Sequence, residues 1–203
     1  MKIICIGRNY ADHIDELANE KPAEPVVFLK PDTALLLKGH PFFIPDFSSE
    51  VHHEVEVLVR INRVGKHIQP KFAHKYYDQI GLGIDFTARD VQSDLKINGL
   101  PWEKAKAFDS SAVVGKWMDK DQLPPSDALP FELEINGRVK QSGNTSLMLW
   151  TIDELIAYVS TFFTLKIGDI LFTGTPSGVG PVKANDQLIG RLAGHDLFNI
   201  KVK

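Results

Sequence analysis

Val51-His52-His53-Glu54-Val55-Glu56-Val57-Leu58-Val59 is the stretch on which the predictions of fold and site depend. Its valines recur at alternate positions, so they form one apolar face of a β-strand, and Glu54 and Glu56 share the opposite face. Residues two apart on one face have Cα atoms ~6.6 Å apart, so both carboxylates can turn toward one small cation. An isolated pair of this kind is usually only a solvated strand face, so the rest of the chain must decide between the two interpretations.

Short strand-like segments lie on both sides of this stretch. They are separated by turns and prolines rather than by regular helices, which favours an α+β fold, rich in β-structure, with antiparallel or mixed sheets. Asn136-Gly137 is a strong hairpin signal, and Thr151 with Glu154 has the capping-box spacing of a helix start. Thr87 with Asp90 resembles a second helix start. No linker divides the chain, so we expect a single domain over residues 1–203. The expected strands cover residues 2–6, 26–29, 51–59, 81–87, 131–135, 168–172 and 198–202.

The composition excludes several classes of protein. The chain has 203 residues, of which 43% are apolar, and a formal net charge of -3. Basic residues are not in surplus, which argues against a nucleic-acid or membrane partner, and no apolar run reaches the roughly 18 residues of a membrane span. Cys5 is the single cysteine and lies in an apolar run. We therefore expect a buried thiol, no intrachain disulfide and a reducing, cytoplasmic location.

Glu54, Glu56 and Asp85 form the candidate metal site. Three carboxylates without a cysteine ligand suit a hard cation such as Mg²⁺ or Mn²⁺, and they leave positions open for water and a substrate. An anionic substrate then needs positive charge nearby, and Arg89 and Lys106 are the candidates, although a lone lysine is more often a solvated surface residue. In a regular strand His53 points away from the two glutamates, so a core or supporting role is favoured over ligation.

Two further features could carry chemistry. His13 and Glu16 are three residues apart on a predicted helix, where the carboxylate could orient the imidazole as a general base; the alternative is a surface ion pair. The segment 173–180 is rich in glycine but lacks the endings of a Walker loop or a dinucleotide fingerprint. Its Thr175 and backbone N–H groups could bind an anion, or the segment could be only a tight turn.

Taken together, five stretches resemble the fumarylacetoacetate hydrolase family, and in particular its short single-domain acylpyruvate hydrolase and oxaloacetate decarboxylase members. They span nearly the whole chain in the family's order, and each alone is weak. They are Gly7-Arg8-Asn9-Tyr10-Ala11-Asp12-His13, His53-Glu54-Val55-Glu56-Val57, Asp85-Phe86-Thr87-Ala88-Arg89-Asp90-Val91-Gln92, Pro101-Trp102 with Lys106-Ala107-Phe108-Asp109, and Gly168-Asp169 with Thr173-Gly174-Thr175-Pro176-Ser177-Gly178-Val179-Gly180.

The resemblance implies a mixed β-sandwich roll, a homodimer and one Mg²⁺ or Mn²⁺ per subunit. Its pattern implies that Glu54, Glu56 and Asp85 are the metal ligands and that His13 and Glu16 form a catalytic dyad on a lid. It also implies that Lys106 is catalytic and that Arg89, Gln92 and Thr175 contact the substrate. At each of these positions the sequence has the residue type that the family pattern requires.

The activity implied is metal-dependent hydrolysis of a C–C bond in acylpyruvate-type 2,4-dioxo acids, such as fumarylpyruvate or acetylpyruvate, to give pyruvate. Decarboxylation of oxaloacetate is a further expected activity, because both reactions pass through a pyruvate enolate. The alternatives are an isomerase or decarboxylase of the 2-hydroxyhepta-2,4-diene-1,7-dioate type and a non-catalytic small-molecule-binding relative. A scaffold freed from catalysis has no physical need for three converging carboxylates, which repel each other without an ion.

Overall fold

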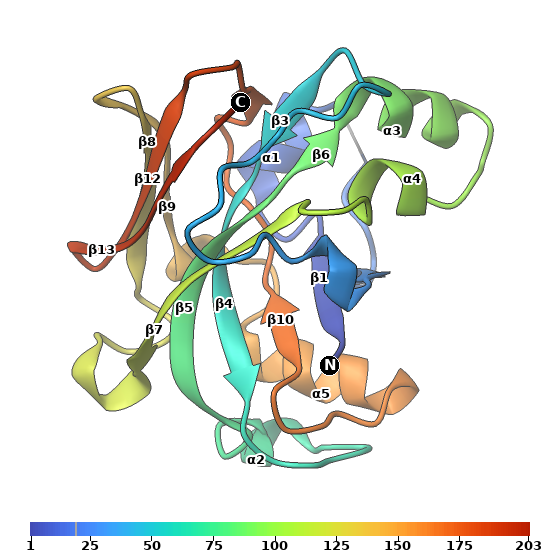
Figure 1. The fold of residues 1–203 in the computed structure, drawn as a ribbon. Helices are drawn as coiled ribbons and strands as arrows, with labels where there is room; N and C mark the ends of the chain where they lie inside the picture. The colour runs from blue at the N-terminus through green and yellow to red at the C-terminus, as the bar shows by residue number, and fades with distance from the viewer. Residues whose placement is uncertain (19) are drawn as a thin grey trace.

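Three β-sheets form the framework of the computed structural model, which describes residues 1–18 and 20–203 (Figure 1). The largest sheet has six strands in the order β2-β1-β10-β4-β5-β7. It is mixed, because β1 and β10 run parallel whereas every other neighbouring pair is antiparallel. Its strands are β1 Ile3–Gly7, β2 Val26–Lys30, β4 Val55–Ile61, β5 Tyr77–Asp85, β7 Ala112–Asp119 and β10 Ile170–Phe172.

The second and third sheets complete a β-rich α+β fold, as predicted. A four-stranded sheet in the order β13-β12-β8-β9 lies to one side of β4 and β5 (Figure 1). Side chains of both sheets, among them Val57, Leu82, Leu133 and Leu188, share one apolar core. The strands of the two smaller sheets are β3 Val51–His53, β6 Thr87–Ala88, β8 Pro130–Ile135, β9 Arg138–Asn144, β11 Gly180–Pro181, β12 Gln187–Leu192 and β13 His195–Lys201.

Helices occupy the connections and the rim. α3 and α4 lie side by side near β6, and α2 packs against α5 (Figure 1). No helix among residues 1–18 and 20–203 is long and apolar enough to cross a membrane. The α-helices are α1 Ala11–Glu16, α2 Pro70–Ala73, α3 Arg89–Ile97, α4 Glu103–Lys106 and α5 Ile152–Phe162, and 3₁₀ turns cover Asp32–Ala34, Lys120–Gln122 and Thr145–Leu147.

The stretch 51–59 is two strands rather than the single strand predicted. β3 pairs with β6 and β11, whereas β4 pairs with β5 and β10, and the chain changes sheets at Glu54. A side-chain amide occupies the break. The Oε1 atom of Gln141 accepts the Val55 N–H at 3.0 Å and lies 2.8 Å from His53 Nδ1. His53 is buried and contacts Gln141, which agrees with the predicted core or supporting role, although the regular strand assumed in that prediction is broken at Glu54.

Two local signals are confirmed and one is wrong. Asn136-Gly137 turns β8 into β9, and Thr151 forms a complete capping box with Glu154. Thr87, however, lies in β6, and α3 begins at Arg89 without a side-chain cap. The reason is that the Thr87 hydroxyl faces the interior, where it accepts a hydrogen bond from Lys106 Nζ at 2.6 Å. The spacing of Thr87 and Asp90 therefore does not indicate a helix cap, because Thr87 binds Lys106 instead.

Close backbone packing of β5 against its neighbours depends on glycine, as predicted for residues 81–87. A Cβ atom at Gly83 would overlap the Val113 carbonyl oxygen and lie 2.7 Å from Leu58 Cδ1. Without a side chain at this position, β5 can pair closely with both β4 and β7. This holds Asp85, at the end of β5, next to the start of β4.

Candidate active site

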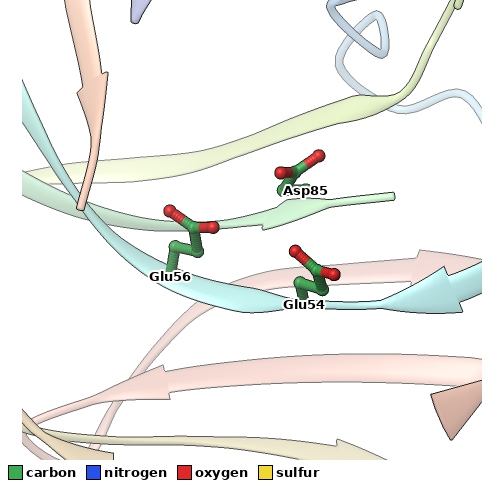
Figure 2. A group of neighbouring side chains, drawn as sticks. All are labelled: Glu54, Glu56 and Asp85. Carbon is green, nitrogen blue, oxygen red and sulfur yellow. The ribbon is translucent and has the colours of Figure 1, made fainter. Parts of the chain in front are cut away.

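Three buried carboxylates converge where β4 and β5 meet. Figure 2 shows Glu54, Glu56 and Asp85 turned into one space from two neighbouring strands. One oxygen of each lies within 4.8 Å of the others, and all three residues are buried. Ligand oxygens around an octahedral Mg²⁺ are about 3–4 Å apart, given metal–oxygen distances of about 2.1 Å. The donor set therefore fits a hard divalent cation after a small closure, and it supplies neither sulfur nor nitrogen.

Positive side chains surround these carboxylates. Lys106 Nζ lies 2.6 Å from Glu54 Oε2 and 2.8 Å from Asp85 Oδ2, and only 4% of the Lys106 side chain is exposed. The alternative of a solvated surface lysine is therefore wrong. Arg89 pairs with the other oxygen of Glu54. Lys30, which the sequence reasoning missed, is fully buried and lies 2.7 Å from Asp85 Oδ1.

The three acids differ sharply in how their charge is compensated. Burial opposes ionisation of Glu54, but Lys106 and Arg89 outweigh it and hold the pKa of Glu54 well below its ordinary value. Burial raises the pKa of Glu56 well above its ordinary value, and the charges of Asp85 and Glu54 raise it further. Its hydrogen bond from the Gly174 N–H, at 2.7 Å, only partly opposes this shift. Glu56 is therefore the carboxylate that gains most from a bound cation.

Because the pKa of Glu56 is raised and carboxylate ligands must be ionised, metal binding is expected to release a proton from Glu56 at pH values where an ordinary carboxyl group is already ionised. We expect Mn²⁺ affinity to rise with pH until Glu56 is ionised in the metal-free protein. Calorimetric titration with Mn²⁺ in two buffers of different ionisation enthalpy measures the proton count. The His13→Gln variant is the control, since it should release the same proton. Equal heats in both buffers would contradict this account.

His13 and Glu16 form a pair beside the carboxylates. His13 Nδ1 lies 3.2 Å from Glu16 Oε2, and the other oxygen of Glu16 accepts the Gly178 N–H at 2.9 Å. Burial lowers the pKa of His13 despite the opposing charges of Glu54 and Glu16, so the ring is neutral at pH 7. A carboxylate can only accept, so Nδ1 carries the proton and Nε2 keeps its lone pair. This is the arrangement required of an oriented base.

The segment before α1 is fastened to the loop 173–180. The side chain of Asn9 is fully buried, donates to the carbonyls of Thr173 and Trp150, and accepts the Trp150 N–H. Thr175 is also buried, and its hydroxyl donates to the Val55 carbonyl at 2.8 Å and accepts from Gln141 at 2.8 Å. The loop 173–180 is therefore linked by hydrogen bonds to the segment before α1, to the start of β4 and to β9.

One pocket collects nearly all the predicted site residues. Glu16 is the exception, because it contacts His13 but is not among the residues that line the pocket. The sequence analysis did not place four further residues at or next to the site: Lys30, Gln141, Arg8 and Lys96. The signal available for Lys30 was a lysine that ends an apolar strand before Pro31. The pocket is lined by His13, Glu54, Glu56, Asp85, Arg89, Gln92, Lys106 and Thr175 of the predicted set, with Ile6, Gly7, Arg8, Leu17, Phe28, Lys96 and Trp102.

One known protein family matches nearly the whole chain. The sequence pattern described as Fumarylacetoacetate (FAA) hydrolase C-terminal matches residues 2–197. The chain belongs to the fumarylacetoacetate hydrolase family. The resemblance read from the five stretches is thereby confirmed, and the β-rich α+β fold is that of the family, as a TM-score of 0.95 to a solved family structure from Yersinia pestis CO92 shows.

Two curated relatives are oxaloacetate tautomerases. The chain is 43% identical to the mitochondrial oxaloacetate tautomerase FAHD1 of Mus musculus over 201 residues, which is 99% of this chain and 91% of that protein. It is 43% identical over 199 residues to the oxaloacetate tautomerase YcgM of Escherichia coli K12, covering 97% of this chain and 90% of that one. Members of this fumarylacetoacetate hydrolase family thus include enzymes that act on oxaloacetate.

A solved structure connects the family to a metal. The fumarylpyruvate hydrolase of Pseudomonas aeruginosa, in complex with Mn²⁺ and pyruvate, superposes with a TM-score of 0.93 at 31% identity. The match covers 100% of this chain and 89% of that one. Family relatives therefore include both a hydrolase and tautomerases, and the acidic triad of the present chain is a candidate site for such an ion.

Proposed function

We propose that this chain is a divalent-metal-dependent enzyme that acts on small 2-oxo acids through their enols, with keto–enol tautomerisation of oxaloacetate as its main reaction. The observation that carries the proposal is the gathering of three buried carboxylates, a buried lysine and a neutral imidazole around one pocket. The names of the two relatives at 43% identity support oxaloacetate as the substrate.

Glu54, Glu56 and Asp85 would hold the ion, either Mg²⁺ or Mn²⁺. When bound, the ion supplies Lewis-acid polarisation of the 2-oxo group. The Mn²⁺ of the Pseudomonas aeruginosa hydrolase supports this assignment. Lys30 and Lys106 hold both oxygens of Asp85 by ion pairs, so that its carboxylate has one fixed orientation.

The remaining residues move the proton and stabilise the charge that forms. His13 takes a proton from C3 of the substrate at Nε2, and Glu16 stabilises the resulting imidazolium. The proton is then delivered to the 2-oxo oxygen, which completes the enol. Lys106 offsets the negative charge of the enolate between these two steps. Arg89, Gln92 and Thr175 would contact the substrate, as the family resemblance implies.

A second candidate reaction is C–C hydrolysis of acylpyruvates, the activity expected from the sequence. The likeness to a fumarylpyruvate hydrolase supports it. His13 would then take its proton from water, which attacks the distal carbonyl, and the C–C bond would break to leave pyruvate and an acid. Loss of CO₂ from oxaloacetate would give the pyruvate enolate, which cleavage of an acylpyruvate also forms, without attack by water. The homodimer, the single domain, the lid and the cytoplasmic location stay predictions.

One assay series tests the proposal. Purified protein with Mn²⁺ or Mg²⁺ is given oxaloacetate, and the loss of the enol's ultraviolet absorbance is followed; pyruvate release is followed with acetylpyruvate and fumarylpyruvate. We expect metal-dependent acceleration of the enol–keto conversion, abolished by a chelator. If the metal-loaded protein accelerates none of these reactions, the proposal is wrong, and the non-catalytic alternative gains support if Mn²⁺ and oxalate still raise the melting temperature.

A further inference from the structure

Two basic residues of the pocket have no part in the chemistry proposed above. Arg8 directly follows β1, and Lys96 lies in the last turn of α3. Both line the same pocket as the acidic triad. Since Arg89, Gln92 and Lys96 are three, four and seven residues apart, they share one face of α3. Arg89 and Gln92 are already assigned to substrate contact, and Lys96 continues their row of polar groups along the same face of α3.

A pair of aromatic rings connects the reacting end of the pocket to Lys96. Lys106 Nζ lies 5.3 Å from the ring centroid of Phe28, and the Phe28 ring packs edge-on against Trp102 with centroids 6.1 Å apart. Lys96 Nζ lies 5.7 Å from the Trp102 ring. An ammonium group thus stands at each end of an apolar wall. A ligand with two negative ends and a short carbon chain between them matches this order of groups.

The net charge of the pocket also favours a ligand with two negative groups over a ligand with one. Arg8, Arg89, Lys96 and Lys106 exceed the three carboxylates of the triad by one charge, and a bound divalent ion adds two more. Burial lowers the pKa of Lys96 to about 8, and the charges of Arg8, Arg89 and Lys106 contribute to the shift. Like charges gathered in one pocket repel each other, and a bound anion removes that repulsion.

Arg8 is also held in an unusual backbone conformation. Its φ angle is 60°, in the left-handed region that residues other than glycine rarely adopt. The neighbouring Asn9 fixes this turn through its three hydrogen bonds to the buried segments at Trp150 and Thr173. Strained backbone of this kind persists where the surroundings over-determine it, and it is found at ligand-binding sites. Here it places Arg8 at the pocket.

We propose that Arg8 and Lys96 bind the carboxylate at the far end of the substrate, so that the enzyme selects short 2-oxo dicarboxylates over monocarboxylic acylpyruvates. This inference rests on the proposed function, since it assumes that the 2-oxo end lies at the acidic triad. Oxaloacetate and fumarylpyruvate belong to the favoured class, and acetylpyruvate belongs to the other. A lysine that merely complements the negative end of the α3 dipole would not discriminate between them.

The test compares Lys96→Gln with Lys104→Gln, a control that removes the same charge from an exposed position on the neighbouring helix α4. We expect Lys96→Gln to lower kcat/KM by about 10- to 100-fold for oxaloacetate and fumarylpyruvate, the effect of losing one charged hydrogen bond. Its kcat/KM for acetylpyruvate should change less than about three-fold, which also shows that the variant is folded. Lys104→Gln should behave as the parent.

Arg8→Gln should reproduce the selective loss. Equal losses for both substrate classes, or no loss for either, would overturn the inference. A binding measurement keeps this result separate from the proposed function. In the Mn²⁺-loaded protein, Lys96→Gln should lose most of the thermal stabilisation by 2-oxoglutarate and retain that by pyruvate. If no substrate is turned over but this selective loss is seen, the proposed reaction is wrong and the distal carboxylate site stands.

Discussion

Glu54→Gln and Glu56→Gln are expected to abolish metal binding alike and to change the stability of the metal-free protein in opposite directions. Glu54 is paired with Lys106 and Arg89. Its removal takes a carboxylate partner from the buried Lys106 and from the partly buried Arg89, so the metal-free variant should lose about 3–5 kcal/mol of unfolding free energy. When ionised, Glu56 adds a third negative charge with little compensation. The glutamine of Glu56→Gln is neutral at every pH, so it relieves this repulsion where Glu56 is ionised and resembles the protonated carboxyl elsewhere. Metal-free Glu56→Gln should therefore be at least as stable as the parent.

Glu56 and Glu54 should also make the stability of the metal-free protein depend on pH in opposite ways. Because the folded-state pKa of Glu56 is raised, the folded protein holds this proton more tightly than the unfolded chain does. Metal-free stability therefore falls as the pH rises from the ordinary carboxyl pKa toward the raised one. Glu56→Gln removes this fall. Glu54, whose pKa is lowered, contributes stability that is present above the ordinary pKa and is lost in acid.

Denaturant melts with and without Mn²⁺ measure both effects. The parent and the control Glu103→Gln, which changes an exposed glutamate on α4, should gain stability from Mn²⁺; neither triad variant should. Both triad variants should lose roughly 10³-fold or more in activity, the share of several kcal/mol that a Lewis acid supplies. Full metal content in either variant would remove that residue from the ligand set. Equal destabilisation of the two metal-free variants would contradict the proposed charge balance.

The shared face of Glu54 and Glu56 could be predicted, because alternation along a strand is a local signal. The glycines of residues 81–87 indicated close strand packing, but it was the family resemblance that joined Asp85 to the two glutamates. The break at Glu54 could not be predicted, since its cause is Gln141, which lies in another sheet. Strand pairing across such sequence separations leaves no trace in local periodicity.

The cations around the site show the same limit. Burial of Lys106 follows from its ion pairs with Glu54 and Asp85, and no pattern near Lys106 itself distinguishes it from a solvated lysine. Lys30 was missed although it ends an apolar strand, because that position alone does not indicate its ion pair with Asp85. Thr87 shows that a correct local signal can be overridden, because its hydroxyl serves Lys106 rather than α3. The family resemblance supplied what periodicity could not, since it joins residues far apart in the chain.

His13→Gln is expected to lower kcat for oxaloacetate tautomerisation by about 10²- to 10⁴-fold, the usual contribution of a positioned general base. Metal affinity and stability should stay close to those of the parent, because no carboxylate of the triad bonds to His13. His74→Gln, at the exposed histidine that forms the C-cap of α2, is the matched control and should keep full activity.

The pH profile separates a base from a residue that only fills space. Burial lowers the pKa of His13, so the parent's rate should fall on acidification only below the ordinary histidine pKa of about 6.5. With Mn²⁺ kept saturating at every pH, so that loss of metal adds no acid limb, this limb should disappear in His13→Gln together with most of the rate. If the variant keeps the limb, another group is the base. If it keeps the rate, the pair with Glu16 is only a structural contact at the rim of the pocket, and the enol must form without a protein base.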